Sequence, residues 1–92
     1  MSTIKKVNMK KTIEYNNKKY KLPFAVLLPK NPIELETVSN RFTGQKAILP
    51  GFAVAVYDVI MGSEVFQDWK SHRQGLDWFQ TNFTNEYYVL LD

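Results

Sequence analysis

Two short runs near the start of the chain, residues 12–15 and 18–22, alternate apolar and polar side chains. A period of two is typical of a β-strand with one buried face. Asn16 and Asn17 separate the runs, and asparagine tolerates the positive φ that a two-residue hairpin turn needs. The pattern therefore predicts a β-hairpin within residues 10–22, with the lysines largely on its outer face. The inner face would hold Ile13, Tyr15, Tyr20 and Leu22.

The middle of the chain, residues 23–49, consists of short extended stretches separated by turn residues. An apolar run at 24–28 lies between two prolines, which favours either an edge strand or an extended segment across the core. Residues 33–38 alternate cleanly and predict a half-buried strand. A turn is expected at 40–44, after which residues 47–49 lead into a helix.

The longest apolar stretch follows Pro50 and covers residues 52–66. Proline suits the first turn of a helix, and the length of the stretch favours a helix, although its β-branched residues also suit a strand. The stretch is apolar nearly all round, and a helix of this kind is normally buried on every side. We therefore expect it to form the centre of the core.

A second helix is predicted from apolar residues spaced three and four apart, with polar residues on the other faces. The apolar stripe consists of Trp69, His72, Leu76, Phe79 and Phe83. Trp78 lies off this stripe. Gly75 inside the helix costs up to about 1 kcal/mol relative to alanine, and close packing against the preceding helix would offset this cost.

The C-terminal residues 84–92 are apolar enough to pack against the core, and residues 86–91 suit a short helix or a strand equally well. The predicted fold is a single α+β domain, with an N-terminal β-hairpin and short strands packed on two helices within residues 50–83. A chain of 92 residues has no room for a second core. Residues 1–9 are polar and weakly patterned, and we expect them to be flexible.

The charge is distributed unevenly along the chain. Residues 1–21 contain seven lysines and one glutamate, a net charge of +6, whereas residues 22–92 carry five basic and eight acidic side chains, a net charge of −3. The protein thus combines a basic N-terminal segment with a mildly acidic body.

Composition excludes several classes of protein. The chain has no cysteine, which excludes disulfides, thiolate metal sites and cysteine nucleophiles. It has no secretory signal and no apolar run of about 20 residues, so we expect a cytoplasmic protein without a membrane partner.

No catalytic apparatus is predicted. The acidic residues of the second half are spread along two helices, whereas general acid–base catalysis needs groups that converge in a cleft. The glycines are too dispersed for a phosphate-binding loop. A single histidine, His72, without cysteine argues against a zinc site, and its place on the apolar stripe indicates a packing or interface role. We therefore expect no enzymatic activity, no metal, no cofactor and no small-molecule substrate.

Asp58 is the anomaly of the first helix, because it interrupts a run that is otherwise expected to be buried. A buried carboxylate needs a partner, which Arg41, Arg73 or a tyrosine hydroxyl could supply. The expected role of Asp58 is structural or at an interface.

The second half of the chain carries several motifs in a distinctive order. They are Asn40-Arg41-Phe42-Thr43-Gly44, Leu49-Pro50, Phe52-Ala53-Val54-Ala55-Val56-Tyr57-Asp58, Gly62-Ser63-Glu64, Gly75-Leu76-Asp77-Trp78-Phe79 and Glu86-Tyr87-Tyr88-Val89-Leu90-Leu91-Asp92. In this order and spacing, residues 40–92 resemble a family of small uncharacterised proteins carried by marine T4-like cyanophages and abundant in ocean metagenomes. The resemblance implies a phage origin, and hence the cytoplasm of an infected host cell, but it implies no activity and no functional residue. Thr84 stands where such sequences often carry proline, so the boundary before the last segment is less sharp here.

The basic segment leads to a first hypothesis, a non-enzymatic accessory protein that associates non-specifically with nucleic acid. Lysines bind phosphates, and aromatic rings stack on bases. The residues concerned are Lys10, Lys11, Lys18, Lys19, Lys21, Tyr15 and Tyr20. The competing interpretation is that the lysines only keep a hairpin edge soluble.

The alternative hypothesis is a protein-interaction or homo-oligomeric assembly module with no nucleic-acid role. In this interpretation Trp78, Tyr87 and Tyr88 are exposed and contact a second copy or a host protein. The two hypotheses are compatible, since a dimer would double the basic surface.

Overall fold

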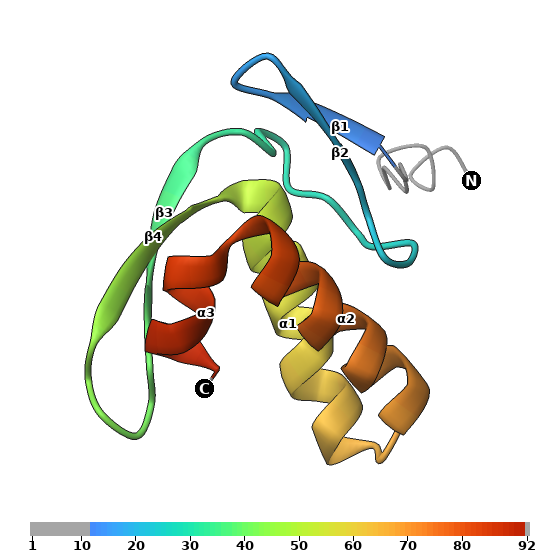
Figure 1. Ribbon diagram of the computed structural model, residues 1–92, viewed down its shortest axis with the longest axis vertical. Helices are drawn as coiled ribbons and strands as arrows, with labels where there is room; N and C mark the ends of the chain where they lie inside the picture. The colour runs from blue at the N-terminus through green and yellow to red at the C-terminus, as the bar shows by residue number, and fades with distance from the viewer. Residues whose placement is uncertain (1–11, 92) are drawn as a thin grey trace.

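The computed structural model describes residues 12–91, which form two β-hairpins followed by three helices (Figure 1). In chain order the elements are β1 (Thr12–Tyr15), β2 (Lys18–Lys21), β3 (Leu35–Ser39), β4 (Lys46–Pro50), α1 (Gly51–Val65), α2 (Trp69–Asn82) and α3 (Thr84–Leu90). The predicted α+β class, with strands first and helices last, is confirmed. The expected flexibility of residues 1–9 and the lysines at positions 10 and 11 lie outside the described residues.

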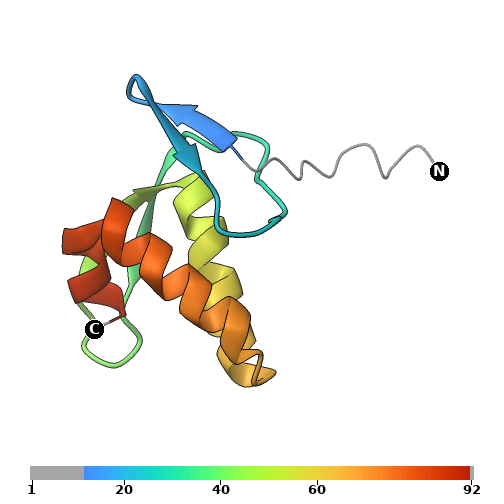
Figure 2. The same ribbon diagram turned by 45° about the vertical axis from the view of Figure 1, so that its right-hand side comes forward.

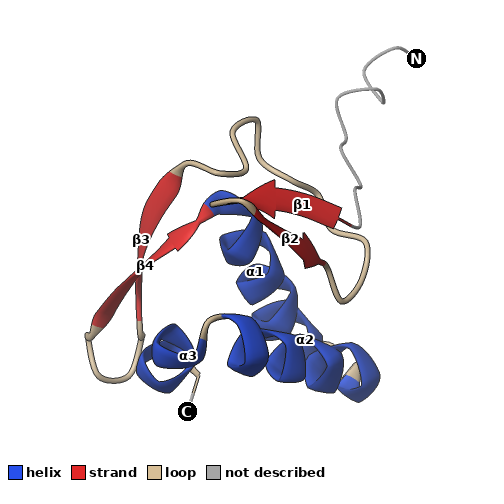
Figure 3. Ribbon diagram, turned by 45° about the horizontal axis from the view of Figure 1, so that its top comes forward, coloured by secondary structure: helices blue, strands red, loops and turns tan. Residues whose placement is uncertain are grey.

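The helices and the two hairpins surround a common apolar core. α1 and α2 run side by side, and α3 packs against α2 and β4 (Figures 1 and 2). The two hairpins form separate two-stranded antiparallel sheets and lie on different sides of α1 (Figure 3). The largest fully buried side chains are Phe52, Phe79, Leu49, Ile60 and Val56. The core is therefore built mainly where β4, α1 and α2 meet.

The β1–β2 hairpin forms as its sequence pattern predicts. Asn16 and Asn17 have φ values of 53° and 62°, which are the two positive angles of a type I′ turn. The register places Ile13 opposite Tyr20 on the inner face, where Ile13 is buried. The hairpin covers the first turn of α1 because the rings of Tyr15 and Tyr20 pack against Phe52, with centroid distances of 5.6 and 5.3 Å.

Residues 24–28 form an extended segment rather than a paired strand. Val26 and Leu28 are buried, whereas Leu27 between them is 66% exposed. Of the two predicted alternatives, the segment across the core is therefore the correct one. The chain then passes the first residue of α1, where Pro29 lies close to Gly51, while β4 continues directly into the helix.

The β3–β4 hairpin is held by Asn40, a buried polar residue that the sequence pattern did not identify. Its Oδ1 accepts hydrogen bonds from the backbone N–H groups of Phe42 and Thr43 at 2.7 and 3.1 Å. Its Nδ2 donates to the Val89 carbonyl of α3 at 2.8 Å. The predicted half-burial of residues 33–38 is wrong, since Val38 alone in β3 is partly buried. The physical reason is that a sheet of only two strands has no neighbouring strands to cover the side chains of β3.

α1 begins at Gly51, where the chain leaves no room for a side chain. A Cβ atom there would lie 2.9 Å from Pro29 Cγ and 3.1 Å from the Asn31 carbonyl oxygen. The expectation that the helix is buried on every side is wrong. One face, including Phe52 and Ile60, is fully buried, but the opposite face is only half-covered. The physical reason is that no further helix or sheet of the described residues packs across that face.

The orientation of α2 differs from the predicted stripe. Trp78 is buried at 8% exposure, and its Nε1 donates to the Lys21 carbonyl at 2.7 Å, whereas Trp69 is 56% exposed. The helix is turned so that Gly75, Trp78 and Phe79 face the core. The predicted close packing of Gly75 is confirmed, since a Cβ atom there would overlap Ile60 Cγ1.

The C-terminal residues form the helix α3, which decides between the two predicted alternatives. Phe83, with φ of −135°, separates α3 from α2 and inserts its ring into the core. The break precedes Thr84, whose hydroxyl donates back to the Gln80 carbonyl at 2.7 Å.

Candidate functional site

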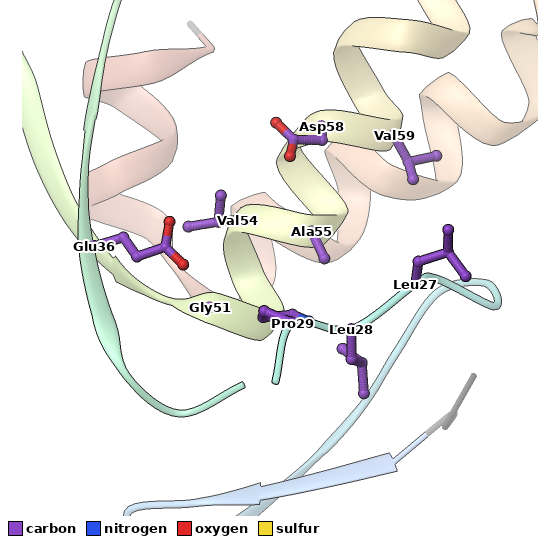
Figure 4. Close-up of a pocket in the computed structure, with 9 residues that line it drawn as sticks. All are labelled: Leu27, Leu28, Pro29, Glu36, Gly51, Val54, Ala55, Asp58 and Val59. Atoms are coloured by element: carbon purple, nitrogen blue, oxygen red, sulfur yellow. The ribbon is translucent and has the colours of Figure 1, made fainter. Parts of the chain in front are cut away.

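A groove of about 520 Å³ lies along the half-covered face of α1. Figure 4 shows α1 between the extended segment on one side and β3 on the other. The lining residues are Leu27, Leu28, Pro29, Glu36, Gly51, Val54, Ala55, Asp58 and Val59. Its volume falls in the range of about 300–1,000 Å³ that is usual for ligand sites. The groove is thus large enough for a few side chains of a partner.

The floor of the groove follows from helical geometry. Positions 51, 54, 55, 58 and 59 recur at the three- and four-residue spacing that places side chains on one face of a helix. Val54, Ala55 and Val59 are each partly buried, so part of their apolar surface is accessible to a ligand. This face of α1 is only partly covered by the 27–29 segment and by β3.

The polar rim of the groove consists of two carboxylates. Asp58 projects from α1 and Glu36 from β3, and both face the groove in Figure 4. Partial desolvation raises the pKa of Asp58 above its ordinary value of 3.8, and the neighbouring charge of Glu36 raises it further. The groove therefore has an apolar floor with negative charge at one side.

The expected environment of Asp58 is wrong. The residue is exposed rather than buried, and its electrostatic neighbour is an acid rather than Arg41, Arg73 or a tyrosine. Polar residues in an apolar stretch mark the solvent side of a helix, and Asp58 marks that side here. The sequence did not identify Glu36, because the groove brings it to Asp58 only through the tertiary fold.

The titration of Asp58 yields a test of this arrangement. Because its folded-state pKa is raised, the folded chain binds more proton than the unfolded chain just above pH 3.8, so stability falls as pH rises through this window. Asp58→Asn is expected to remove that slope and to raise the free energy of unfolding at neutral pH. Urea titrations between about pH 4 and 7 measure both. Asp77→Asn on α2 is the control, and an unchanged slope in Asp58→Asn would contradict the assignment.

The described lysines of the hairpin do not form one face. Lys19 and Lys21 alternate onto the outer face, where Glu14 lies opposite Lys19. Lys18 belongs to the other face, and its Nζ lies 4.9 Å from the ring centroid of Tyr20. The predicted outer-face position thus holds for Lys19 and Lys21 but not for Lys18.

The two tyrosines of the predicted nucleic-acid surface take part in the core. Tyr15 meets Phe52 edge-on, and Tyr20 stacks on Phe83 with a centroid distance of 5.6 Å and an interplanar angle of 16°. Both rings are half-buried. Their contacts leave less ring surface for stacking on bases than a free hairpin would offer.

The predicted interface aromatics lie in different environments. Trp78 is buried, so its expected exposure is wrong, because its indole ring fills the space between Phe52 and Phe83. Tyr87 is half-buried and Tyr88 is 53% exposed, with their rings edge-on at 5.6 Å.

The structure exposes other aromatic side chains that the sequence did not single out. They are Phe42, Phe66 and Trp69, at 88%, 83% and 56% exposure. Phe42 and Phe66 lie in turns, and their position in turns was the signal that could have predicted their exposure. His72 is half-buried beside Trp69, with the two rings perpendicular at 5.6 Å.

Within residues 12–91, no three or more His, Cys, Asp or Glu side chains gather in a way that could hold a metal ion. The helices of this same part of the chain are too short or too polar to cross a bilayer. Comparisons with protein-family models, curated proteins and solved structures found no match for the chain.

Proposed function

We propose that this protein is a non-enzymatic interaction module that binds a protein segment in the groove along α1. The observation that supports the proposal most is the half-covered apolar face of α1 beside the two carboxylates. Val54, Ala55 and Val59 provide a surface whose burial contributes roughly 25 cal/mol per Å². Asp58 and Glu36 add the few polar groups that orient a ligand on such a surface.

The wider surface agrees with this proposal. Leu27 and Leu35, on the two segments beside the groove, and Ile33, in the turn before β3, are each more than half exposed. Exposed apolar surface that adjoins a groove is a usual feature of protein-interaction sites. A nucleic-acid role through residues 10–21 stays a prediction, since the half-buried tyrosines favour it less than the groove favours a protein partner.

The groove can be tested without knowing the partner. A peptide-display library selected on the full chain is expected to yield peptides that combine apolar and basic residues, with micromolar affinity. Ala55→Arg fills the groove and should weaken their binding at least tenfold. Ala25→Arg, the same substitution at an exposed position outside the groove lining, is the matched control.

The site of binding is checked by amide chemical-shift changes, which should cluster at residues 54–59. If selection yields no binding peptide, or if the peptides bind Ala55→Arg as tightly as the unaltered chain, the proposal is wrong.

A further inference from the structure

The two carboxylates of the groove specify the charge of its occupant. Asp58 and Glu36 both line the groove, and the pKa of Asp58 is raised first by partial burial and then by the neighbouring charge of Glu36. A cation placed beside them would relieve this repulsion, by an amount that salt reduces because both carboxylates are exposed. An occupant with a basic group and an aliphatic portion therefore fits the groove best.

The chain itself contains a surface of that chemistry. Residues 1–21 carry a net charge of +6, and the body, with a net charge of −3, contains the groove. Lys19 and Lys21 lie exposed on the outer face of the β1–β2 hairpin, together with Glu14, so this face carries two positive charges and one negative charge. A lysine stem packs on apolar surface while its ammonium group reaches an acid. The stems would contact Val54 and Val59, and the ammonium groups Asp58 and Glu36.

The outer-face lysines of one molecule are poorly placed to reach its own groove. The inner face of the hairpin is held against Phe52 by Tyr15 and Tyr20, and alternate side chains of a strand point to opposite sides. Lys19 and Lys21 therefore point away from the body to which they belong. They remain free to enter the groove of another molecule.

We infer that the occupant of the α1 groove is the basic hairpin face of a second copy of this chain. A twofold axis would let each copy supply one hairpin and one groove, so that both contacts form at once and the assembly closes as a dimer. Each groove then receives from its partner the positive charges that it lacks. The inference rests on the proposed function and names the partner.

Light scattering and sedimentation of the full chain test this. The unaltered protein is expected to dimerise at 0.1 M salt and to dissociate progressively towards 1 M, as the screening length falls from about 10 to about 3 Å. One double variant reverses the groove, Glu36→Lys with Asp58→Lys. A second reverses the hairpin, Lys19→Glu with Lys21→Glu. Each is expected to weaken dimerisation roughly 100-fold, because like charges then meet.

Mixing the two variants gives the decisive measurement. In the mixture each hairpin meets a groove of opposite charge, so a heterodimer is expected to form at the concentration where each variant alone is monomeric. This rescue also shows that both variants are folded. The control, Glu64→Lys with Asp77→Lys, changes the charge equally at exposed positions outside the groove and should still dimerise.

The inference and the proposed function fail in different ways. A monomeric unaltered protein, or dimers that neither double variant weakens, would overturn the inference, as would a mixture that stays monomeric. The proposed function would still stand if selected peptides bind the groove of the monomer. It fails only if the groove binds no peptide.

Discussion

Replacing Phe52 by alanine is expected to lower the free energy of unfolding by about 3–5 kcal/mol, the cost of removing a buried aromatic ring and leaving a cavity. Phe52 is fully buried at the first turn of α1. Its ring meets those of Tyr15, Tyr20, Trp78 and Phe83, with centroid distances between 5.3 and 6.3 Å. The substitution therefore loosens the β1–β2 hairpin and α2 together.

This cost is large for a small domain. Stabilities of about 5–15 kcal/mol are usual, so Phe52→Ala removes at least about a fifth of the stability. Phe66→Ala is the control, because Phe66 is 83% exposed and its loss should change stability by no more than about 0.5 kcal/mol. Urea unfolding followed by tryptophan fluorescence measures both, since Trp78 contacts the altered ring. Equal losses in the two variants would contradict the position of the ring in the core.

The hairpin and the helices could be predicted from local patterns, because local chemistry determines them. Asn16 and Asn17 have positive φ, which asparagine favours in a two-residue turn. The alternation on either side of the turn determines which face of the hairpin is buried. Gly75 was also informative, since its close packing against Ile60 was predicted, although Gly62 within α1 has open space beside it. The turn and the alternating strands can be predicted without knowledge of the tertiary fold.

The partners of each helix face could not be predicted in the same way. The apolar stretch of α1 indicates burial on all sides, but burial depends on how many other elements the chain supplies. Trp78 was missed because a small rotation of α2 about its axis, by less than the angle between successive residues, buries Trp78 and exposes Trp69. A helical stripe identifies a face only approximately, and tertiary packing decides the rest.

The candidate site shows the same limit. Asp58 was conspicuous in the sequence, but as a buried residue in need of a basic partner. The groove requires three separate segments, and Glu36 reaches it from β3. Nothing local to Glu36 distinguishes it from other strand carboxylates. The apolar residues of the groove floor could be identified in the sequence, whereas their partial exposure depends on the tertiary fold.

The contact between α1 and α2 predicts that the effect of Gly75→Ala on the free energy of unfolding depends on the residue at position 60. Gly75→Ala is expected to lower the free energy of unfolding by about 1–2 kcal/mol, because overpacking costs about 1–3 kcal/mol and outweighs the helix propensity gained. The new Cβ atom would overlap Ile60 Cγ1 and lie 3.1 Å from Ile60 Cδ1. Ile60 is itself fully buried, and its Cγ1 lies close to the backbone of α1 rather than at the end of a flexible side chain.

The same substitution is expected to be neutral or stabilising once Ile60 is alanine. Ile60→Ala alone costs about 2–5 kcal/mol, as a large-to-small change in a core does. It also removes the overlapping atoms, and the nearest remaining neighbour of the new methyl group is Phe24 Cζ at an ordinary 3.4 Å. In that background Gly75→Ala keeps only its propensity gain of up to about 1 kcal/mol. A double-mutant cycle by urea unfolding measures this coupling. Equal effects of Gly75→Ala in both backgrounds would mean that the two helices do not meet at Gly75 and Ile60.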